Sequence, residues 1–273
     1  MGETKDGKKI ILYETQVENA ILKEIGRLRE ISFREVGEGS GKKRDIDYHD
    51  FSYKHLIVWD NEALEIAGAY RIGLCRDIID DEGVEGLYTS SLFTFEKGFD
   101  IYFERGIELG RSFVQPKYWN SRALDYLWQG IGAYIRNYPQ IRYLFGPVTL
   151  SNALSTEAKE LLIFFYQHYF GAKEQLVKHK EPYIFADSQN SKAKALFCGV
   201  DYRADLRTLR EELAVMGFTI PTLYKQYSEI CEEGGVEFMD FGYDHDFNDC
   251  IDGFIVCDMD RLKASKRKRY IGE

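Results

Sequence analysis

Charged residues stand beside or inside apolar segments at three places in this chain. The first is the acidic segment Asp45–Asp50, the second is Arg71 after Gly-Ala-Tyr, and the third holds Glu108 and Arg111 just before Phe-Val. An isolated charge is costly to remove from water, so charges inside a sheet or at its open end are usually paired. Such pairs often belong to functional sites, so these residues are the first candidates for chemistry.

The order and spacing of these motifs resemble the amino-acid N-acyltransferases that make ornithine and glycine lipids, which are often labelled hemolysin-like. The pattern is also similar to their relatives, the acyl-homoserine-lactone synthases, and both groups belong to the GNAT superfamily. The resemblance covers roughly residues 25 to 185. No single motif is specific, but their order is. Besides the charged motifs, it rests on Arg29–Arg34, Leu127–Gly130, Tyr143–Val148 and the later stretch Asp240–Phe254.

The resemblance implies transfer of an acyl group from a thioester to an amine. Such aminolysis needs a base, donors for the oxyanion and a place for the thiol, and backbone N–H groups at a strand irregularity can supply the donors. By the same resemblance, Glu108 is the expected base, acting directly or through water. The alternative for Glu108 is a buried partner of Arg71 or Arg111.

The acidic segment and the two arginines are expected to meet. Asp47 and Asp50 lie three residues apart and can share a face. The matching acids of the related synthases are functional, so these two are expected to bind the substrate ammonium or to orient Arg71, with solvated turn acids as the alternative. Arg71 and Arg111 either pair with these carboxylates or hold the carboxylate of the amino acid in bidentate fashion.

The donor is expected to bind at the segment from Gln115 to Arg122. GNAT enzymes that use coenzyme A usually have a glycine-rich loop there, and this chain has no glycine in it. A basic loop suits the phosphopantetheine arm of acyl carrier protein, with Lys117 and Arg122 as contacts, and makes acyl-CoA the less favoured donor. An ordinary strand-to-helix loop is the alternative. Resemblance also makes Tyr166 a candidate acid for the departing thiolate, against a simple core role.

Composition restricts the partners. A net charge of −9 argues against nucleic-acid binding and would suit a cationic amine, although a solvated acidic surface explains it equally. Five scattered cysteines without a C-x-x-C pair indicate no disulfide framework and no metal site. The N-terminus lacks a signal-peptide pattern and no apolar run is long enough to cross a bilayer, so we expect a cytoplasmic location.

Six basic residues near the C-terminal end stand out from this acidic balance: Arg261, Lys263, Lys266, Arg267, Lys268 and Arg269. A solvated tail is the simplest interpretation. Such a cluster can also dock an acidic carrier protein or anionic lipid headgroups, which would add a peripheral contact with the inner face of the membrane.

Apolar periodicity predicts the elements that position these residues. Helices are expected at 14–34, 122–138 and 155–170, the last ending in a left-handed cap at Gly171, and the region 191–233 reads as helical. Strands are expected at 55–60, 64–74, 141–148 and 253–257, with strands or short elements at 87–95 and 106–114 and an acidic connection at 77–85.

These elements predict a mixed α/β (α+β) sheet of the GNAT type. We expect a core over residues 8–190 and a C-terminal extension, 191–273, packed on it. The predicted function is transfer of a long, 3-hydroxylated acyl chain from acyl carrier protein to the α-amine of an amino acid such as ornithine or glycine, in aminolipid biosynthesis. The alternatives are an acyl-homoserine-lactone synthase and a non-catalytic acyl-binding or membrane-active hemolysin-like protein.

Overall fold

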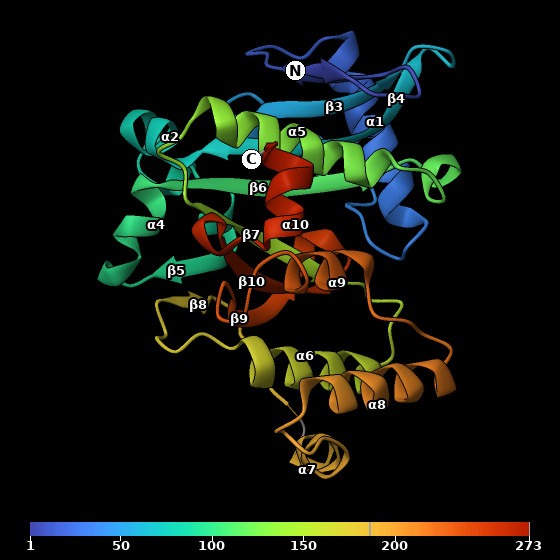
Figure 1. Cartoon of the computed structure of the whole chain (residues 1–273), viewed down its shortest axis with the longest axis vertical. Coiled ribbons are helices and arrows are strands. Elements are labelled where there is room, and N and C mark those ends of the chain that lie inside the picture. Colours follow the sequence, from blue (N-terminus) through green and yellow to red (C-terminus); the bar gives the residue numbers. More distant parts are fainter. Residues whose placement is uncertain (186, 273) are drawn as a thin grey trace.

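A large mixed sheet forms the centre of the computed structural model, which describes residues 1–185 and 187–272 (Figure 1). The strand order is β1-β2-β3-β4-β6-β7-β10-β9. Strands β5 and β8 form a separate pair. The strands are β1 (Gly2–Glu3), β2 (Lys8–Tyr13), β3 (Lys54–Asp60), β4 (Glu65–Leu74), β5 (Phe93–Phe95), β6 (Gly106–Val114), β7 (Tyr143–Leu150), β8 (Val177–His179), β9 (Val236–Asp244) and β10 (Cys250–Asp258).

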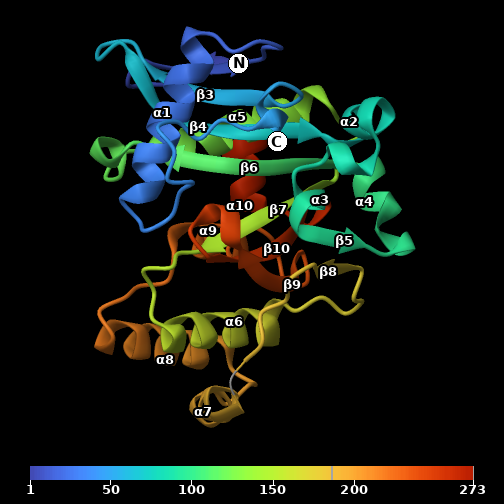
Figure 2. The ribbon, with the colours of Figure 1, turned by 180° about the vertical axis from the view of Figure 1, so that it is seen from behind.

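Helices cover both faces of this sheet. Helix α1 contacts β6 on one face, whereas α5 crosses β3 and β4 on the other, as the two opposite views show (Figures 1 and 2). None of the described helices is both long and apolar enough to cross a membrane. The helices are α1 (Ala20–Arg34), α2 (Cys75–Glu82), α3 (Thr89–Leu92), α4 (Asp100–Glu104), α5 (Ala123–Asn137), α6 (Thr156–Phe170), α7 (Asp187–Leu196), α8 (Tyr202–Val215), α9 (Thr222–Ser228) and α10 (Ala264–Lys266).

The sequence-based expectations hold for the long, strongly periodic elements. The mixed sheet flanked by helices is confirmed, and the segment 106–114, expected to be a strand or a short element, coincides with strand β6. Three local expectations are wrong. The first helix begins at Ala20 instead of residue 14. Most of the connection 77–85 is helix α2, and Gly171 ends α6 with φ −59° and ψ 134°, outside the left-handed region. The helix therefore leaves directly into an extended segment.

The C-terminal part of the chain contributes to the same sheet. Strand β10 pairs with β7 along its whole length and β9 pairs with β10, so residues 236–258 form one edge of the sheet. Sequence analysis found β10 but not β9. The expected boundary at residue 190 stays a prediction, although these two strands continue the core sheet across it.

Strands β6 and β7 are the only parallel neighbours in the described part of the sheet, and they separate soon after they meet. They pair from Gly106 to Glu108 and then run on without further pairing. The separation begins at Gly146 and Pro147. A Cβ at Gly146 would lie 2.1 Å from the carbonyl oxygen of Leu109, and proline cannot donate a ladder hydrogen bond. The sequence Phe145-Gly146-Pro147 thus allows β7 to approach β6 closely and then ends the pairing of the two strands.

A β-bulge lies in β6 opposite the same opening. Residues 69 and 71 of β4 pair with residues 113 and 110 of β6, so β6 contains one extra residue there. Arg111 has a φ of 48°, a left-handed conformation that is uncommon for a residue with a side chain. Bulges of this kind redirect side chains and interrupt the ladder beside functional sites.

Replacing Gly146 with alanine should strain this junction. The added methyl group would press on the Leu109 carbonyl, so we expect a loss of about 1–3 kcal/mol or more in the free energy of unfolding, measured by urea denaturation. Gly110→Ala is the matched control, because a Cβ there meets nothing within 4 Å. Equal stability of the two variants would contradict the close approach of β6 and β7.

Candidate active site

A cavity of about 520 Å³ fills the opening between β6 and β7. Its wall includes Phe33 from α1 and Leu124 from α5. These helices lie on opposite faces of the sheet (Figures 1 and 2). Because residues of both helices line it, the cavity reaches both faces of the sheet. On the α5 side its wall is largely apolar and aromatic: Tyr118, Trp119, Leu124, Ile220, Leu223 and Tyr227.

The α1 side of the cavity carries charge. Glu38, Arg111, Thr149 and Asp252 all line it. Asp252 is 2% exposed and accepts a hydrogen bond of 2.7 Å from the Thr149 hydroxyl. Burial and the negative charge of Asp244 raise the pKa of Asp252 to about 7, and burial with the charge of Asp252 raises the pKa of Glu38 to about 8.

Sequence analysis did not single out Glu38 or Asp252. Asp252 had a signal that could have been used, because it is the only charge within the apolar run Cys250–Cys257. Glu38 lies in the glycine-rich loop after α1, where charge is ordinary. Only the fold brings it to the cavity.

The acidic segment and the arginines meet as expected, in a buried network that borders the cavity at Arg111. Arg71 binds Asp47 at 2.6 Å and Asp50 at 3.4 Å. The network also contains a third arginine, from α1. Its other ion pairs are Arg29–Asp50 at 3.0 Å, Arg29–Asp45 at 3.6 Å, Arg111–Asp45 at 3.1 Å and Arg111–Asp47 at 3.5 Å.

The arginines of this network keep Asp47 and Asp50 ionised. Although burial opposes it, Arg71 and Arg111 hold the pKa of Asp47 well below its usual range. Arg29 and Arg71 likewise lower the pKa of Asp50 against the effect of burial. Three arginines thus face three aspartates, and their charges balance within the network.

Aromatic rings fix the two arginines of β4 and β6. The Arg71 guanidinium lies 5.2 Å from the ring centre of Tyr53 and 5.0 Å from that of Tyr88. Arg111 donates a hydrogen bond of 3.0 Å to the Tyr88 hydroxyl, which in turn donates to Asp244 at 3.2 Å. Of these two arginines, only Arg111 lines the cavity.

Glu108 lies apart from the cavity wall. Its carboxylate accepts hydrogen bonds from the Tyr53 hydroxyl, from the backbone N–H of Tyr88 at 3.2 Å and from that of Thr89 at 2.7 Å. Among the described residues, neither Arg71 nor Arg111 forms an ion pair with it. Burial raises the pKa of Glu108. Its role as base stays a prediction, and the alternative of direct pairing with an arginine is wrong.

The remaining predicted residues divide between core and surface. Tyr166 is 1% exposed and packs against the rings of Tyr224 and Phe238, away from the cavity wall. Lys117 and Arg122 are exposed on the loop between β6 and α5, where Lys117 contacts Glu65 and Arg122 lies 3.4 Å from Asp125. Their predicted roles remain untested by this geometry.

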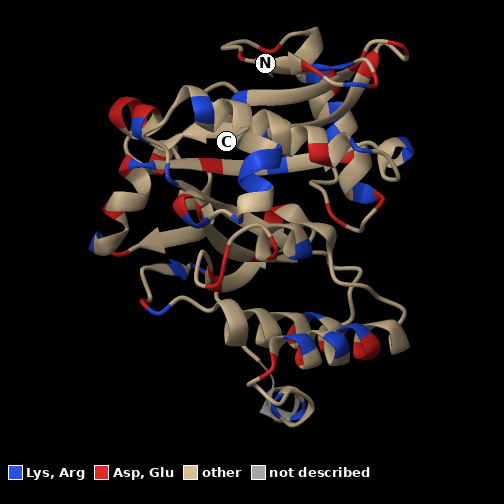
Figure 3. Ribbon diagram, viewed as in Figure 1, with Lys and Arg blue, Asp and Glu red and all other residues tan. Residues whose placement is uncertain are grey.

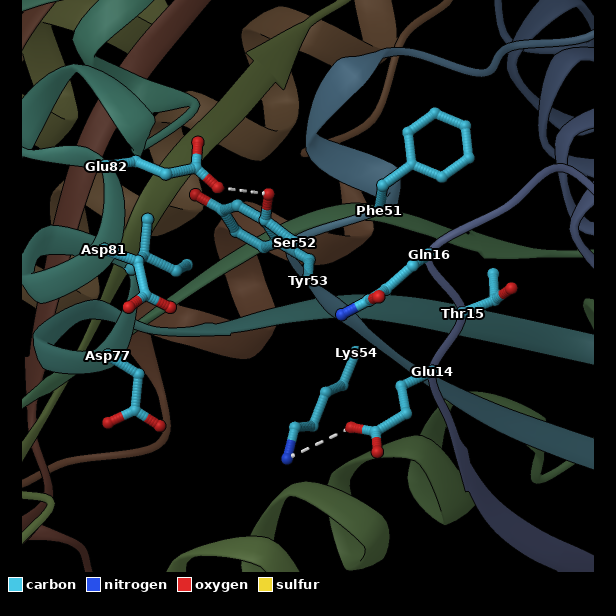
Figure 4. A pocket seen from close by; sticks show the side chains of 11 residues that line it. Glu14, Thr15, Gln16, Phe51, Ser52, Tyr53, Lys54, Asp77, Asp81 and Glu82 are labelled. Atoms are coloured by element: carbon cyan, nitrogen blue, oxygen red, sulfur yellow. Dashed lines mark hydrogen bonds and ion pairs between the residues drawn. The ribbon is translucent and has the colours of Figure 1, made fainter.

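A second hollow, of about 560 Å³, opens on the surface beside α2 (Figure 4). Its acidic side chains are Glu14, Asp77, Asp81 and Glu82, and Lys54 is the cation among the lining residues, 3.4 Å from Glu14. Tyr53 also lines it, and its hydroxyl reaches Glu108 behind the wall. Tyr53 therefore separates this hollow from the buried arginines.

Removing one charge from the buried network should be costly. Asp50→Asn leaves two buried arginines short of a partner, so we expect a loss of about 3–5 kcal/mol in urea unfolding at pH 7. Asp80→Asn, which breaks an exposed pair with Arg76, is the control and should change stability by less than about 0.5 kcal/mol.

The same network should weaken in acid. The pKa values of Asp47 and Asp50 are lower in the folded state than their ordinary value of 3.8, so the unfolded state binds more protons there. Stability should therefore fall as the pH drops below about 4. A variant with Asp50→Asn whose stability equals that of the wild type would contradict the network.

Glu108→Gln tests which role Glu108 has. The amide offers one acceptor oxygen to three donors and turns an N–H group toward one of them, so we expect unfolding to become easier by about 1–3 kcal/mol. If the side chain is structural, the turnover of the folded fraction should change little. If Glu108→Gln is as stable as the wild type but has lost its turnover, Glu108 takes part in the reaction.

Comparison with known proteins agrees with this fold. The family model described as an acetyltransferase (GNAT) domain matches residues 28–129. The glycine N(alpha)-acyltransferase of Bacteroides thetaiotaomicron is 34% identical over 98% of this chain and 82% of that protein. The enzyme of the same name from Phocaeicola vulgatus is 32% identical over 98% of this chain and 85% of that protein.

More distant relatives match in part. The L-ornithine N(alpha)-acyltransferase of Rhizobium meliloti is 34% identical over 39% of this chain and 37% of that protein. Among solved structures, the CoA-dependent acyl-homoserine lactone synthase MesI is 12% identical, with a TM-score of 0.35 over 85% of this chain and 76% of that chain. With its GNAT domain and its near full-length match, the chain belongs to the family of the bacterial glycine N(alpha)-acyltransferases and is an acyltransferase.

Proposed function

We propose that this enzyme transfers a long acyl chain, 3-hydroxylated as in aminolipid biosynthesis, from acyl carrier protein to the α-amine of glycine or a similar amino acid. The observation that carries the proposal is the cavity between β6 and β7, which is apolar on the α5 side and acidic on the α1 side. An acyl thioester fits the first environment and an ammonium the second. The near full-length relatives that are named for glycine support that acceptor.

The bulge in β6 suits the reacting carbonyl. Gly110, Arg111 and Ser112 line the cavity where the ladder is interrupted, so a backbone N–H there can stabilise the oxyanion of the tetrahedral intermediate. Arg111 belongs to the same wall and would hold the carboxylate of the amino acid. In this arrangement Arg71 positions Asp47 and Asp50, and through Asp47 it fixes Arg111.

The proposed donor side is basic. Asp125 lies between Arg122, at 3.4 Å, and Arg269, at 2.7 Å, so the loop before α5 and the C-terminal basic cluster form one continuous surface. Figure 3 shows the Lys and Arg residues of this terminal segment gathered in front of the sheet. An acidic carrier protein would dock there with its arm directed to the apolar side of the cavity. A peripheral contact with anionic lipid would use the same charges.

Product analysis tests the activity. The purified chain, given 3-hydroxyacyl carrier protein and glycine, should form N-acylglycine, identified by mass spectrometry. Ornithine and S-adenosylmethionine in place of glycine complete the acceptor series. Acylation of S-adenosylmethionine alone would overturn the proposal in favour of an acyl-homoserine-lactone synthase.

Charge reversal tests the donor. Lys117→Glu and Arg122→Glu should each raise the KM for acyl carrier protein by roughly tenfold at low salt, with kcat little changed, because rim charges act mainly on encounter. Lys173→Glu, in the exposed segment before β8, is the matched control and should behave as the wild type. Equal efficiency with acyl-CoA, or no response to either reversal, would contradict docking at this surface.

A further inference from the structure

The acidic side of the cavity holds two carboxyl groups without a protein counter-ion. The arginine network is balanced by Asp45, Asp47 and Asp50, so Glu38 and Asp252 lie outside that charge balance. Among the residues that the structure describes, neither forms an ion pair with a lysine or arginine. Both line the cavity, and Asp252 is almost completely buried. A buried carboxylate without a partner is costly unless a cation or a proton joins it.

Asp252 is also held in a fixed direction. Thr149, its cross-strand neighbour on β7, donates to Oδ1 at 2.7 Å, and both residues line the cavity. The other oxygen, Oδ2, has no hydrogen bond to any described residue. Glu38 approaches from the loop after α1, and its side chain likewise has no hydrogen-bond partner in the described chain. This end of the cavity therefore has one carboxyl group that is fixed by a hydrogen bond, Asp252, and one that is not, Glu38.

We propose that Asp252 and Glu38 form the amine subsite of this acyltransferase, where Glu38 holds the ammonium of the acceptor and Asp252 takes the proton that the amine must lose. This inference rests on the proposed function and names the residues that the acceptor meets. In this proposal the proton of the ammonium goes to Asp252, which lines the cavity. Glu108 does not line the cavity, and its carboxylate already accepts three hydrogen bonds.

An N–H bond of the ammonium breaks, its electron pair stays on nitrogen, and the proton passes to Oδ2 of Asp252. The neutral nitrogen attacks the thioester carbonyl, so a C–N bond forms and charge develops on the oxygen. When that intermediate collapses, the C–S bond breaks and sulfur leaves with the electron pair. A second proton from nitrogen neutralises the thiolate, and the proton on Asp252 returns to solvent.

The surroundings of Asp252 suit a base that works near neutral pH. Burial and Asp244 disfavour its charge, whereas Thr149 and Arg111 favour it. The other titratable groups that interact with it are Glu38 from the loop after α1, Tyr88 before α3, Tyr224 from α9 and Cys250 on its own strand. A carboxylate that is ionised only above about pH 7 accepts a proton more readily than an exposed one.

The pH dependence of glycine acylation tests the inference. For the wild type, kcat/KM for glycine should rise as Asp252 ionises, in addition to the rise from the amine of glycine that all variants share. Asp252→Asn keeps the acceptor for Thr149 but cannot take a proton, so kcat should fall about 10²–10⁴-fold. The rise of kcat/KM near pH 7 should disappear in this variant. Asp252→Glu should recover part of the rate. Asp249→Asn, exposed in the same hairpin, is the matched control.

Glu38→Gln supplies a second measurement, because this half-buried side chain has no hydrogen bond whose loss could unfold the protein. It should raise the KM for glycine roughly tenfold, with a smaller change in kcat. Glu35→Gln, exposed three residues earlier, is its control and should leave both constants unchanged.

The outcomes separate the two proposals. A folded Asp252→Asn enzyme with wild-type kcat and pH profile overturns the amine subsite while the proposed function stands. If that variant does not fold, an unchanged KM for glycine in Glu38→Gln overturns it instead. If the wild type acylates no amino acid with either type of donor, the proposed function fails and the inference fails with it.

Discussion

The separation of β6 from β7 is the constraint on which the rest of the site depends. Two neighbouring parallel strands normally bury their shared edge by continuous hydrogen bonding. Here the pairing stops after Glu108, and each strand has an irregularity beside the gap: the bulge at Arg111 in β6 and Gly146-Pro147 in β7. The gap is thus bordered by backbone that has left the ladder. This opening creates a cavity that reaches both faces of one sheet.

The two faces then differ because different segments cover them. On the α5 side, the loop before α5 and the segment before α9 supply aromatic and aliphatic side chains. On the α1 side, the loop after α1 and strand β10 each supply a carboxylate, and β7 supplies the hydroxyl of Thr149. A long acyl thioester and an ammonium have opposite solvation requirements, so a uniformly polar or uniformly apolar cavity would suit only one of them. Because the strand opening lies between two differently covered faces, one cavity contains both environments.

The buried ion network explains why Arg111 can stay at this opening. A lone guanidinium there would be expensive, and its left-handed backbone adds strain. Asp45, Asp47 and Tyr88 hold it from one side, and Arg29 and Arg71 complete the charge balance from α1 and β4. Part of this arrangement could be predicted from the local sequence. Charges inside apolar runs predicted that the acidic segment meets Arg71 and Arg111, because desolvation leaves few other solutions.

Other parts could not be obtained from local patterns. Arg29 reads as one of many charges on an amphipathic helix, and Glu38 belongs to a glycine-rich loop that only the fold carries to the cavity. Strand β9 was missed because its edge position leaves several polar residues along it, which weakens the apolar signal. Glu108 shows the opposite problem: a carboxylate before an arginine in a strand looks like an ion pair, but tertiary contacts from Tyr53 and Thr89 satisfy it first.

The distribution of protons follows from these contacts. Glu108 and Asp252 are both buried carboxylates, yet their surroundings differ in kind. Three donors converge on Glu108, and its carboxylate is not part of the cavity wall. Asp252 has one donor, from Thr149, and a second oxygen on the cavity side. A proton acceptor must have an unoccupied lone pair where the proton arrives, as well as a suitable pKa. By that criterion, the proposed amine subsite assigns this role to Asp252 on strand β10, because its free oxygen lies where the acceptor amine would arrive.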